Sequence, residues 1–180
     1  MSPKEEESKN RKAEILEAAA ALFAESGYYK TTTADVARAV GVTQPYVFHF
    51  FKSKEQLYLA VLDNAYEKIL HAFNTAEAPP EQLPEAMGKA FADLLATHRN
   101  EILLVMMSYA TPEDAVRQKC QERFDTVYER VKSRFEQAGI PDAAGRARDF
   151  IGQGMIISLA ETLNLPKLLP WHGKLGPDCD

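Results

Sequence analysis

Apolar residues recur every three or four positions along most of this 180-residue chain. No stretch alternates apolar and polar side chains in the way that a half-buried strand does. The pattern predicts an all-α protein with roughly eight helices and no sheet. The first helix is expected from Glu7 to Ser26, and Gly27 follows where a helix commonly ends in the left-handed conformation.

Two short helices are predicted next, each beginning at a hydroxyl residue. Thr32 and Asp35 have the spacing of a capping box, which opens a helix that ends near Val40. Thr43 can cap the second short helix. Pro45 is tolerated in the first turn of that helix, because the first amides of a helix have no partner within it.

The remaining helices are longer and are separated by proline or glycine. Ser53 and Gln56 form a second capping box, which begins a helix that reaches about Asn74. A proline-rich connection over residues 75–84 comes next, and the tail after Pro166 is expected to be irregular. The other helices are expected over Leu83–Leu95, Asn100–Tyr109, Pro112–Gly139 and Asp142–Leu163. The segment from 100 to 109 is apolar nearly all round, which predicts a buried helix.

The two short helices have the spacing of a helix-turn-helix, in which the second helix can enter the major groove of DNA. Six apolar side chains would pack between them, namely Val36, Ala37, Val40, Val42, Val47 and Phe51. The side chains left pointing away from that core are Gln44, Pro45, Tyr46, His49 and Phe50. From the apolar pattern alone, a helical hairpin inside an all-helical core is an equally good interpretation.

The stretch TTTADVARAVGVTQPYVFHFFKSKEQLYLAVL, residues 31–62, resembles the N-terminal DNA-binding segment of TetR-family regulators. The matching positions are Thr32, Asp35, Val36, Ala37, Gly41, Val42, Thr43, Val47, Phe51, Lys52, Ser53, Lys54 and Glu55. With the leading helix that ends at Gly27, the resemblance covers roughly residues 10–62. It implies a DNA-binding domain over residues 1–55, followed by a helical effector-binding and dimerisation domain over residues 56–180.

The resemblance also implies which side chains contact double-stranded DNA. The candidates are Thr32, Thr33, Thr43, Gln44, Pro45, Tyr46, His49, Lys52 and Lys54. Gln44 is expected to bond a base edge, with adenine the usual partner of an amide side chain, and Tyr46 to reach a thymine methyl group or a sugar. His49 and Lys54 are expected at phosphates. Phe48 stands where the family usually has tyrosine, so its ring lacks a hydroxyl group and is expected only to pack.

The second domain is expected to bind an apolar or aromatic small-molecule effector and to form a homodimer. The candidate effector-binding residues are Phe73, Met87, Phe91, Leu94, Leu95, Leu103, Met106, Met107, Tyr109, Phe124 and Tyr128. Each of them could equally be an ordinary core residue. Small and apolar residues of the last helix suggest a dimer interface, with Phe150, Ile151, Gly154, Ile157 and Ser158 as candidates.

Charge and composition agree with this interpretation without deciding it. Residues 1–55 hold eight Lys or Arg and eight Asp or Glu, so the rest of the chain accounts for the net charge of −5. Residues 26–54 are locally basic, which suits contact with phosphates. The chain shows no secretory signal, no membrane span and no disulfide pattern, so a soluble, cytoplasmic protein is expected.

Two other classes of function, an enzyme and a DNA-binding factor gated by a protein, are alternatives to an effector-gated regulator. No nucleophile elbow, phosphate loop or His-Glu-x-x-His motif is present, and the four histidines are scattered. We therefore expect neither catalysis nor a metal or cofactor. The second alternative is a DNA-binding factor of the same fold that is gated by a protein partner. It stays open, because only the response of the protein to a small molecule distinguishes it from an effector-gated regulator.

Overall fold

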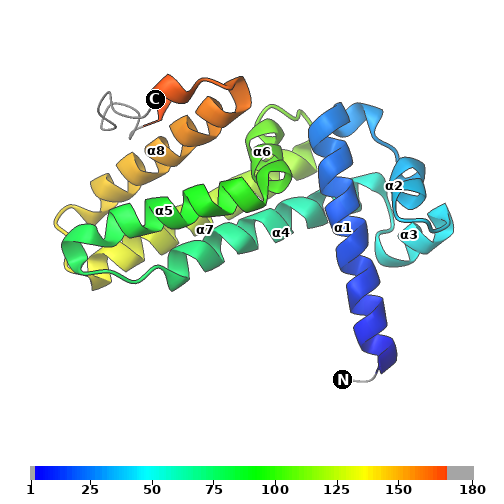
Figure 1. The fold of residues 1–180 in the computed structure, drawn as a ribbon, viewed down its shortest axis with the longest axis horizontal. Coiled ribbons are helices and arrows are strands. Elements are labelled where there is room, and N and C mark those ends of the chain that lie inside the picture. The colour runs from blue at the N-terminus through cyan, green and yellow to red at the C-terminus, as the bar shows by residue number, and fades with distance from the viewer. Residues whose placement is uncertain (1–2, 170–180) are drawn as a thin grey trace, which may run out of the picture.

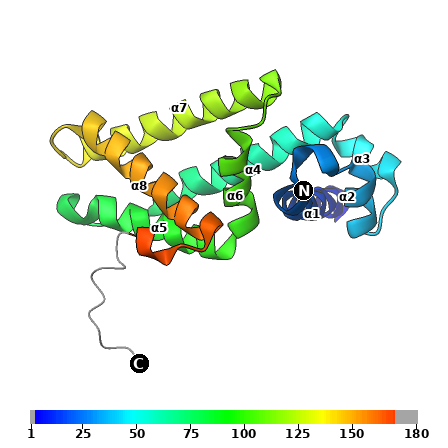
Figure 2. The same ribbon diagram turned by 90° about the horizontal axis from the view of Figure 1, so that it is seen from above.

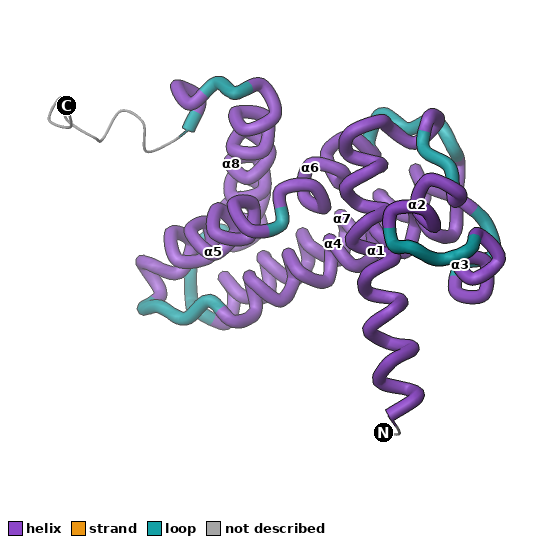
Figure 3. The backbone as a smooth tube through the Cα atoms, turned by 45° about the vertical axis from the view of Figure 1, so that its right-hand side comes forward, coloured by secondary structure: helices purple, strands orange, loops and turns teal. Residues whose placement is uncertain are grey.

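The computed structural model describes residues 3–169, and this part of the chain folds into eight α-helices without a β-strand (Figure 1). The helices are α1 (Pro3–Lys30), α2 (Thr33–Ala39), α3 (Gln44–Phe50), α4 (Lys54–Thr75), α5 (Leu83–Thr97), α6 (Arg99–Ser108), α7 (Asp114–Gln137) and α8 (Ala143–Leu163). Figure 3 shows that only short loops join them. The all-α fold predicted from the sequence is confirmed.

The first three helices form a unit at one end of the molecule, where α2 and α3 lie beside α1 (Figure 1). Phe23 of α1, Val36 of α2 and Val47 of α3 are each fully buried. Gly27 interrupts α1 with φ 77° and ψ 169°, a backbone conformation that favours glycine. The Thr31 hydroxyl group donates to the carbonyl oxygens of Leu22 and Gly27, at 3.0 and 2.9 Å, and so satisfies acceptors at the kinked end of α1.

Helix α4 runs from this unit into the rest of the molecule and packs against α1, α5, α6 and α7. The Ser53 hydroxyl group caps its first turn by accepting a bond from the Gln56 amide at 3.0 Å, as the predicted capping box requires. Buried residues recur along the helix from Leu57 to Phe73. Because α4 is one continuous helix, it is the covalent connection between the two ends of the protein, and packing of α1 against α6 joins the two ends as well.

Ion pairs hold α6 and α7 against α4. Lys68 of α4 lies 2.5 Å from the carboxylate of Glu101 on α6. Arg123 of α7 lies 2.7 Å from Asp63 and 2.8 Å from Glu67, both on α4. These pairs are at most partly buried, so they orient the helices more than they stabilise the fold.

The last two helices form a hairpin that closes over the remaining faces of α4 and α5. Figure 2 shows α8 between α5 and α7, and α8 contacts both of them. Gly139, with φ 71°, follows α7, as the predicted helix break requires. Asp142 then caps α8, accepting a bond from the Gly145 amide at 3.2 Å.

Several helix ends differ from the predicted ones. α1 begins at Pro3, because the charged segment before Glu7 continues the helix. Pro112 lies before α7, which begins at Asp114, so it is not in the first turn. The short 3-10 helices η1 (Pro80–Gln82) and η2 (Pro166–Leu168) occupy segments that were expected to be irregular. The tail from 170 onward, and Cys179 with it, lies outside the described residues.

The prediction that α6 is buried on all sides is wrong. Its residues from Glu101 to Val105 are buried, but Met107 and Tyr109 are 42% and 38% exposed. The side chains packed against α6 cover one face of its last turn and leave the other face open. None of the helices over residues 3–169 is long and apolar enough to cross a membrane.

Candidate functional site

The outward face of α3 is the candidate nucleic-acid interface. Val47 alone in this helix is fully buried, and it holds α3 against α2. Gln44, Pro45, Tyr46 and His49 are exposed, as predicted from the helix-turn-helix spacing. Their positions on one short, firmly packed helix give the face a fixed shape, which suits insertion into a major groove.

Aromatic rings support one another along this face. The ring of Tyr46 stacks on His49, with centroids 6.4 Å apart, and meets Phe50 edge-on at 5.4 Å. Phe50 is half-buried and packs in turn against Phe51, so it is not one of the outward side chains. The contacts restrict the rotamers of Tyr46 and His49 before any DNA is bound.

A hydrogen bond orients the side chain of Gln44. Its amide nitrogen donates to the hydroxyl oxygen of Thr33, with 2.8 Å between Nε2 and Oγ1. Thr33 is buried at the start of α2, so its hydroxyl group serves this bond. The second N–H group and the carbonyl oxygen of Gln44 remain available, and these are the two groups that pair with an adenine edge.

The hydroxyl groups of Thr32 and Thr43, which are also predicted to contact DNA, differ in the hydrogen bonds that they already make within the protein. The Thr32 hydroxyl group accepts from the Asp35 amide at 3.2 Å, and the Thr32 amide donates to the Asp35 carboxylate at 3.0 Å, which completes the predicted capping box. The Thr32 hydroxyl group also donates to that carboxylate at 2.6 Å. These bonds from Thr32 lower the pKa of the Asp35 carboxyl group. Thr43 holds the N-cap position of α3 but makes no side-chain capping bond, so its hydroxyl group is not used there.

The two lysines after α3 have different surroundings. Lys52 is exposed. Lys54 lies 4.5 Å from the centre of the Tyr28 ring and donates to the Tyr28 carbonyl oxygen at 3.0 Å. Lys54 therefore joins the start of α4 to the end of α1, a role that the sequence did not suggest.

The expectation that Phe48 only packs is wrong. Its ring is 40% exposed, because Phe48 follows the buried Val47 by one residue and is turned about 100° around the helix away from it. Phe48 therefore adds an exposed apolar ring to α3.

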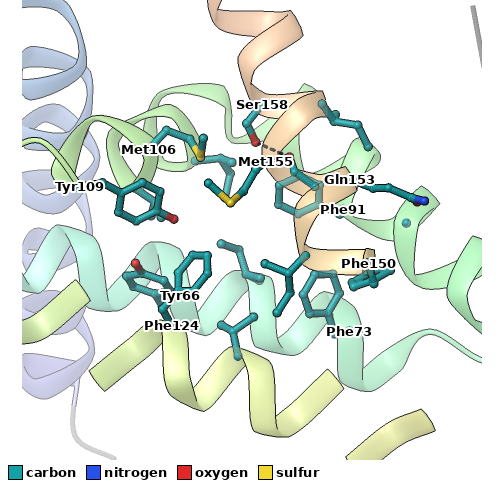
Figure 4. Close-up of a pocket in the computed structure, with 18 residues that line it drawn as sticks. Tyr66, Phe73, Phe91, Met106, Tyr109, Phe124, Phe150, Gln153, Met155 and Ser158 are labelled. Atoms are coloured by element: carbon teal, nitrogen blue, oxygen red, sulfur yellow. Dashed lines mark hydrogen bonds between the residues drawn. The ribbon is translucent and has the colours of Figure 1, made fainter. Parts of the chain in front are cut away.

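A second candidate site is an apolar cavity of about 80 Å³ between α4, α5, α6, α7 and α8 (Figure 4). Five of the predicted effector-binding residues line it, namely Phe73, Phe91, Met106, Tyr109 and Phe124. The other six, Met87, Leu94, Leu95, Leu103, Met107 and Tyr128, lie elsewhere, on faces that turn into other parts of the core or to the surface.

All five candidate dimer-interface residues also line this cavity, namely Phe150, Ile151, Gly154, Ile157 and Ser158. Phe150, Ile157 and Ser158 are buried within the protomer. The face of α8 that we assigned to a partner subunit therefore faces inward. The outer face of α8 instead presents Ile156, Leu159 and Leu163, which are 44–57% exposed.

Two tyrosines supply hydroxyl groups to the cavity lining. Tyr66 of α4 is 1% exposed, and its hydroxyl group makes no hydrogen bond of regular geometry within the described residues, although the Tyr109 hydroxyl group and the Cys120 thiol group lie close to it. Figure 4 shows the hydroxyl groups of Tyr66 and Tyr109 at the same end of the cavity. Burial raises the pKa of both hydroxyl groups, so both are protonated near neutral pH.

The model of the bacterial regulatory proteins of the tetR family matches residues 15–61, which span α1 to the first part of α4. The HTH-type transcriptional regulator YfiR of Bacillus subtilis is 31% identical over 152 residues, covering 78% of this chain and 71% of that protein. The chain belongs to the TetR family. It is a TetR-family transcriptional regulator with a DNA-binding helix-turn-helix formed by α2 and α3.

Two further relatives extend the likeness of this regulator beyond the helix-turn-helix. The HTH-type transcriptional repressor KstR2 of Mycolicibacterium smegmatis is 29% identical over 150 residues, covering 76% of this chain and 68% of that protein. The solved structure of AibR in complex with isovaleryl coenzyme A and operator DNA is 25% identical, with a TM-score of 0.65. It covers 83% of this chain and 86% of that chain.

Sequence reasoning missed several residues of this TetR-family regulator that the structure places at the two sites. Tyr66, Ile69 and Met155 line the cavity. Tyr66 continues the apolar stripe of α4 at the spacing of Leu62 and Phe73, and a hydroxyl group within such a stripe is a signal that could have found it. No comparable signal points to Tyr28 as the partner of Lys54, because the two are far apart in the sequence. Over residues 3–169, no group of histidine, cysteine and carboxylate side chains could hold a metal ion.

Proposed function

We propose that this TetR-family regulator is a homodimeric repressor that binds a palindromic operator and is released by a small apolar or aromatic molecule. One observation supports the link between the two sites. Lys54, in the first turn of α4, is bonded to Tyr28 at the end of α1, and Tyr66, Ile69 and Phe73 of the same helix line the cavity. About 18 Å of rigid helix separates Lys54 from Tyr66, so an occupant that shifts α4 also shifts α1, and through α1 it shifts α2 and α3, since α2 packs against both α1 and α3.

The proposed functional boundary follows from the same helix. Residues 1–55 supply the DNA-binding part and residues 56–180 the effector-binding and dimerisation part, and the division falls in the first turn of α4. Since no linker separates the parts, movement in one is transmitted to the other through packed side chains.

The proposed DNA contacts come from the N-terminus of α2, from α3 and from the segment after it. Gln44 would read a base edge, with Tyr46 and Pro45 beside it, while His49, Lys52, Thr43 and Thr32 would position the phosphate backbone. The buried Thr33 would contribute indirectly, by orienting Gln44. Lys54 acts there both as a positive charge and as the bond between α1 and α4.

The proposed dimer interface is the outer face of α8. Ile156, Leu159 and Leu163 follow the spacing of one helical stripe, and all three are exposed in the protomer. Pairing of this stripe with its copy around a two-fold axis would bury apolar surface and place two recognition helices on successive major grooves.

Selection of operators from random DNA, followed by fluorescence anisotropy, tests this proposal. We expect inverted half-sites about one helical turn apart or a multiple of it, and release of the DNA by one-ring apolar molecules. A selected site without inverted symmetry would contradict dimeric binding. If no small molecule releases the DNA while a protein from the same cell does, gating by a protein partner replaces effector gating.

A further inference from the structure

The Tyr66 hydroxyl group is a buried polar group that makes no hydrogen bond of regular geometry, although the Tyr109 hydroxyl group and the Cys120 thiol group lie close to it. It lies on α4 at the wall of the cavity, and the residue is 1% exposed. Buried hydroxyl groups are nearly always hydrogen-bonded in folded proteins, because leaving one without a partner costs free energy. A hydroxyl group at a cavity wall without a hydrogen bond of regular geometry is therefore a place where a ligand atom would be favoured.

From this we infer that the effector is an uncharged, mostly apolar molecule with one oxygen acceptor, a carbonyl or ether oxygen, that receives a hydrogen bond from Tyr66. The inference rests on the proposed function, since it names the class of ligand for the same cavity. Tyr109 presents its hydroxyl group at the same end of the cavity and is placed to bond the same oxygen (Figure 4).

The rest of the lining supports an uncharged ligand. No charged residue lines the cavity. The hydroxyl group of Ser158 already donates to the Gly154 carbonyl oxygen at 3.0 Å. Gln153 also lines the cavity, but it is exposed and its amide group is uncharged. A buried carboxylate would thus meet no positive partner, whereas a neutral oxygen needs only the two tyrosines.

The size of the cavity limits the ligand further. Its volume of about 80 Å³ is below the 300–1,000 Å³ that is typical of drug-sized ligand sites. Two methionines, Met106 and Met155, line it, and such unbranched side chains rotate readily to make room. A ligand of about one ring therefore fits better than a long or branched one.

Three probes of similar size test separately whether the ligand needs an oxygen acceptor and whether it must be uncharged. They are acetophenone with a carbonyl oxygen, ethylbenzene without oxygen, and benzoate with a charge. Their dissociation constants for the full-length protein are measured by calorimetry without DNA. We expect acetophenone to bind about tenfold more tightly than ethylbenzene, the effect of one hydrogen bond, and benzoate to bind more weakly than both. Equal binding of the first two, tightest binding of benzoate, or no binding of any probe would overturn the inference.

Two variants test whether the hydroxyl groups of Tyr66 and Tyr109 cause the preference for acetophenone over ethylbenzene. Tyr66→Phe should bring acetophenone and ethylbenzene to within about twofold of each other, and Tyr109→Phe should reduce the ratio by a smaller amount. Tyr128→Phe is the matched control, since Tyr128 does not line the cavity, and it should keep the wild-type ratio. An unchanged ratio in Tyr66→Phe would overturn the assignment. If acetophenone binds with the expected preference but does not release DNA, the proposed function fails and the ligand class stands.

Discussion

The side-chain amide of Gln44 on α3 donates a hydrogen bond of 2.8 Å to the hydroxyl oxygen of the buried Thr33 on α2. The bond joins the two helices of the helix-turn-helix through the residue proposed to read a base. Since one N–H group is held by Thr33, the orientation of the remaining N–H and carbonyl groups is set before DNA arrives. Preorganisation of this kind lowers the entropy cost of binding.

Replacing Gln44 with alanine should relax specificity at one base position, by about 1–3 kcal/mol. Thr33→Val should cause a smaller loss at the same position, because the amide stays but is no longer oriented. Anisotropy titrations on operators that carry each base at that position measure both effects. Gln118→Ala, a change on the distant α7, is the control. Equal losses on every operator would contradict base reading by Gln44.

Lys54→Met and Lys52→Met should have different effects, because Lys54 has a structural role in addition to its charge, whereas Lys52 is expected only to contact a phosphate. Loss of the Tyr28 contacts in Lys54→Met should lower the free energy of unfolding by about 1–2 kcal/mol. Lys52→Met should leave stability within about 0.5 kcal/mol of the wild type. It should weaken binding to all sequences alike, and its salt slope should fall by about one.

Urea unfolding and DNA titrations at several salt concentrations test the lysine pair. If Lys54→Met has wild-type stability and a salt slope lowered by one, Lys54 is a simple phosphate contact and the bond to Tyr28 has little energetic weight.

Ile156→Lys combined with Leu159→Lys should convert the dimer to a monomer, because two charges would then face their copies across the proposed interface. Analytical ultracentrifugation gives the mass of the particle. Met107→Lys replaces an equally exposed apolar residue on α6 and should leave the dimer intact. A dimer that survives the α8 double substitution would exclude this face as the interface.

Alkaline pH should destabilise the protein partly through Tyr58. Burial raises the pKa of Tyr58 to about 12, whereas it is 10.0 in an exposed tyrosine. Below pH 10 the phenol is protonated in both the folded and unfolded states. Between pH 10 and 12 the unfolded chain loses this proton and the folded one retains it, so stability falls by about 2–3 kcal/mol.

Urea unfolding from pH 8 to pH 12 measures this loss, and Tyr58→Phe should show a slope shallower by about one proton over the last two pH units. Identical slopes for the wild type and Tyr58→Phe would show that Tyr58 titrates alike in the folded and unfolded states.

The two helices of the helix-turn-helix were predictable because their signals are local, whereas their assignment to DNA binding depended on the family resemblance. The capping boxes at Thr32 and Ser53 and the breaks after α1 and α7 each depend on residues within four positions of one another. Such signals act through backbone hydrogen bonds and dihedral angles that neighbouring residues control directly. The burial of Val36, Val47 and Phe51 followed from the same spacing.

The cavity was predicted only in part, since apolar periodicity does not distinguish a core face from a hollow. Phe91 and Met87 both lie on the apolar face of α5, yet Phe91 lines the cavity and Met87 is packed in the core. The inward face of α8 was mistaken for a dimer interface for the same reason. Small and apolar residues permit close packing against a partner helix of either subunit.

The sequence by itself determined the all-α fold, the positions of most helices and the outward direction of Gln44, Tyr46 and His49 on α3, all of which depend on contacts between near neighbours. The tertiary structure decided that Gln44 is oriented by Thr33, that Lys54 holds Tyr28, and that Tyr66 faces a cavity without a hydrogen bond of regular geometry. These relationships depend on how whole helices rotate and pack against one another. That packing is the sum of many weak contacts, and no single local pattern in the sequence predicts it.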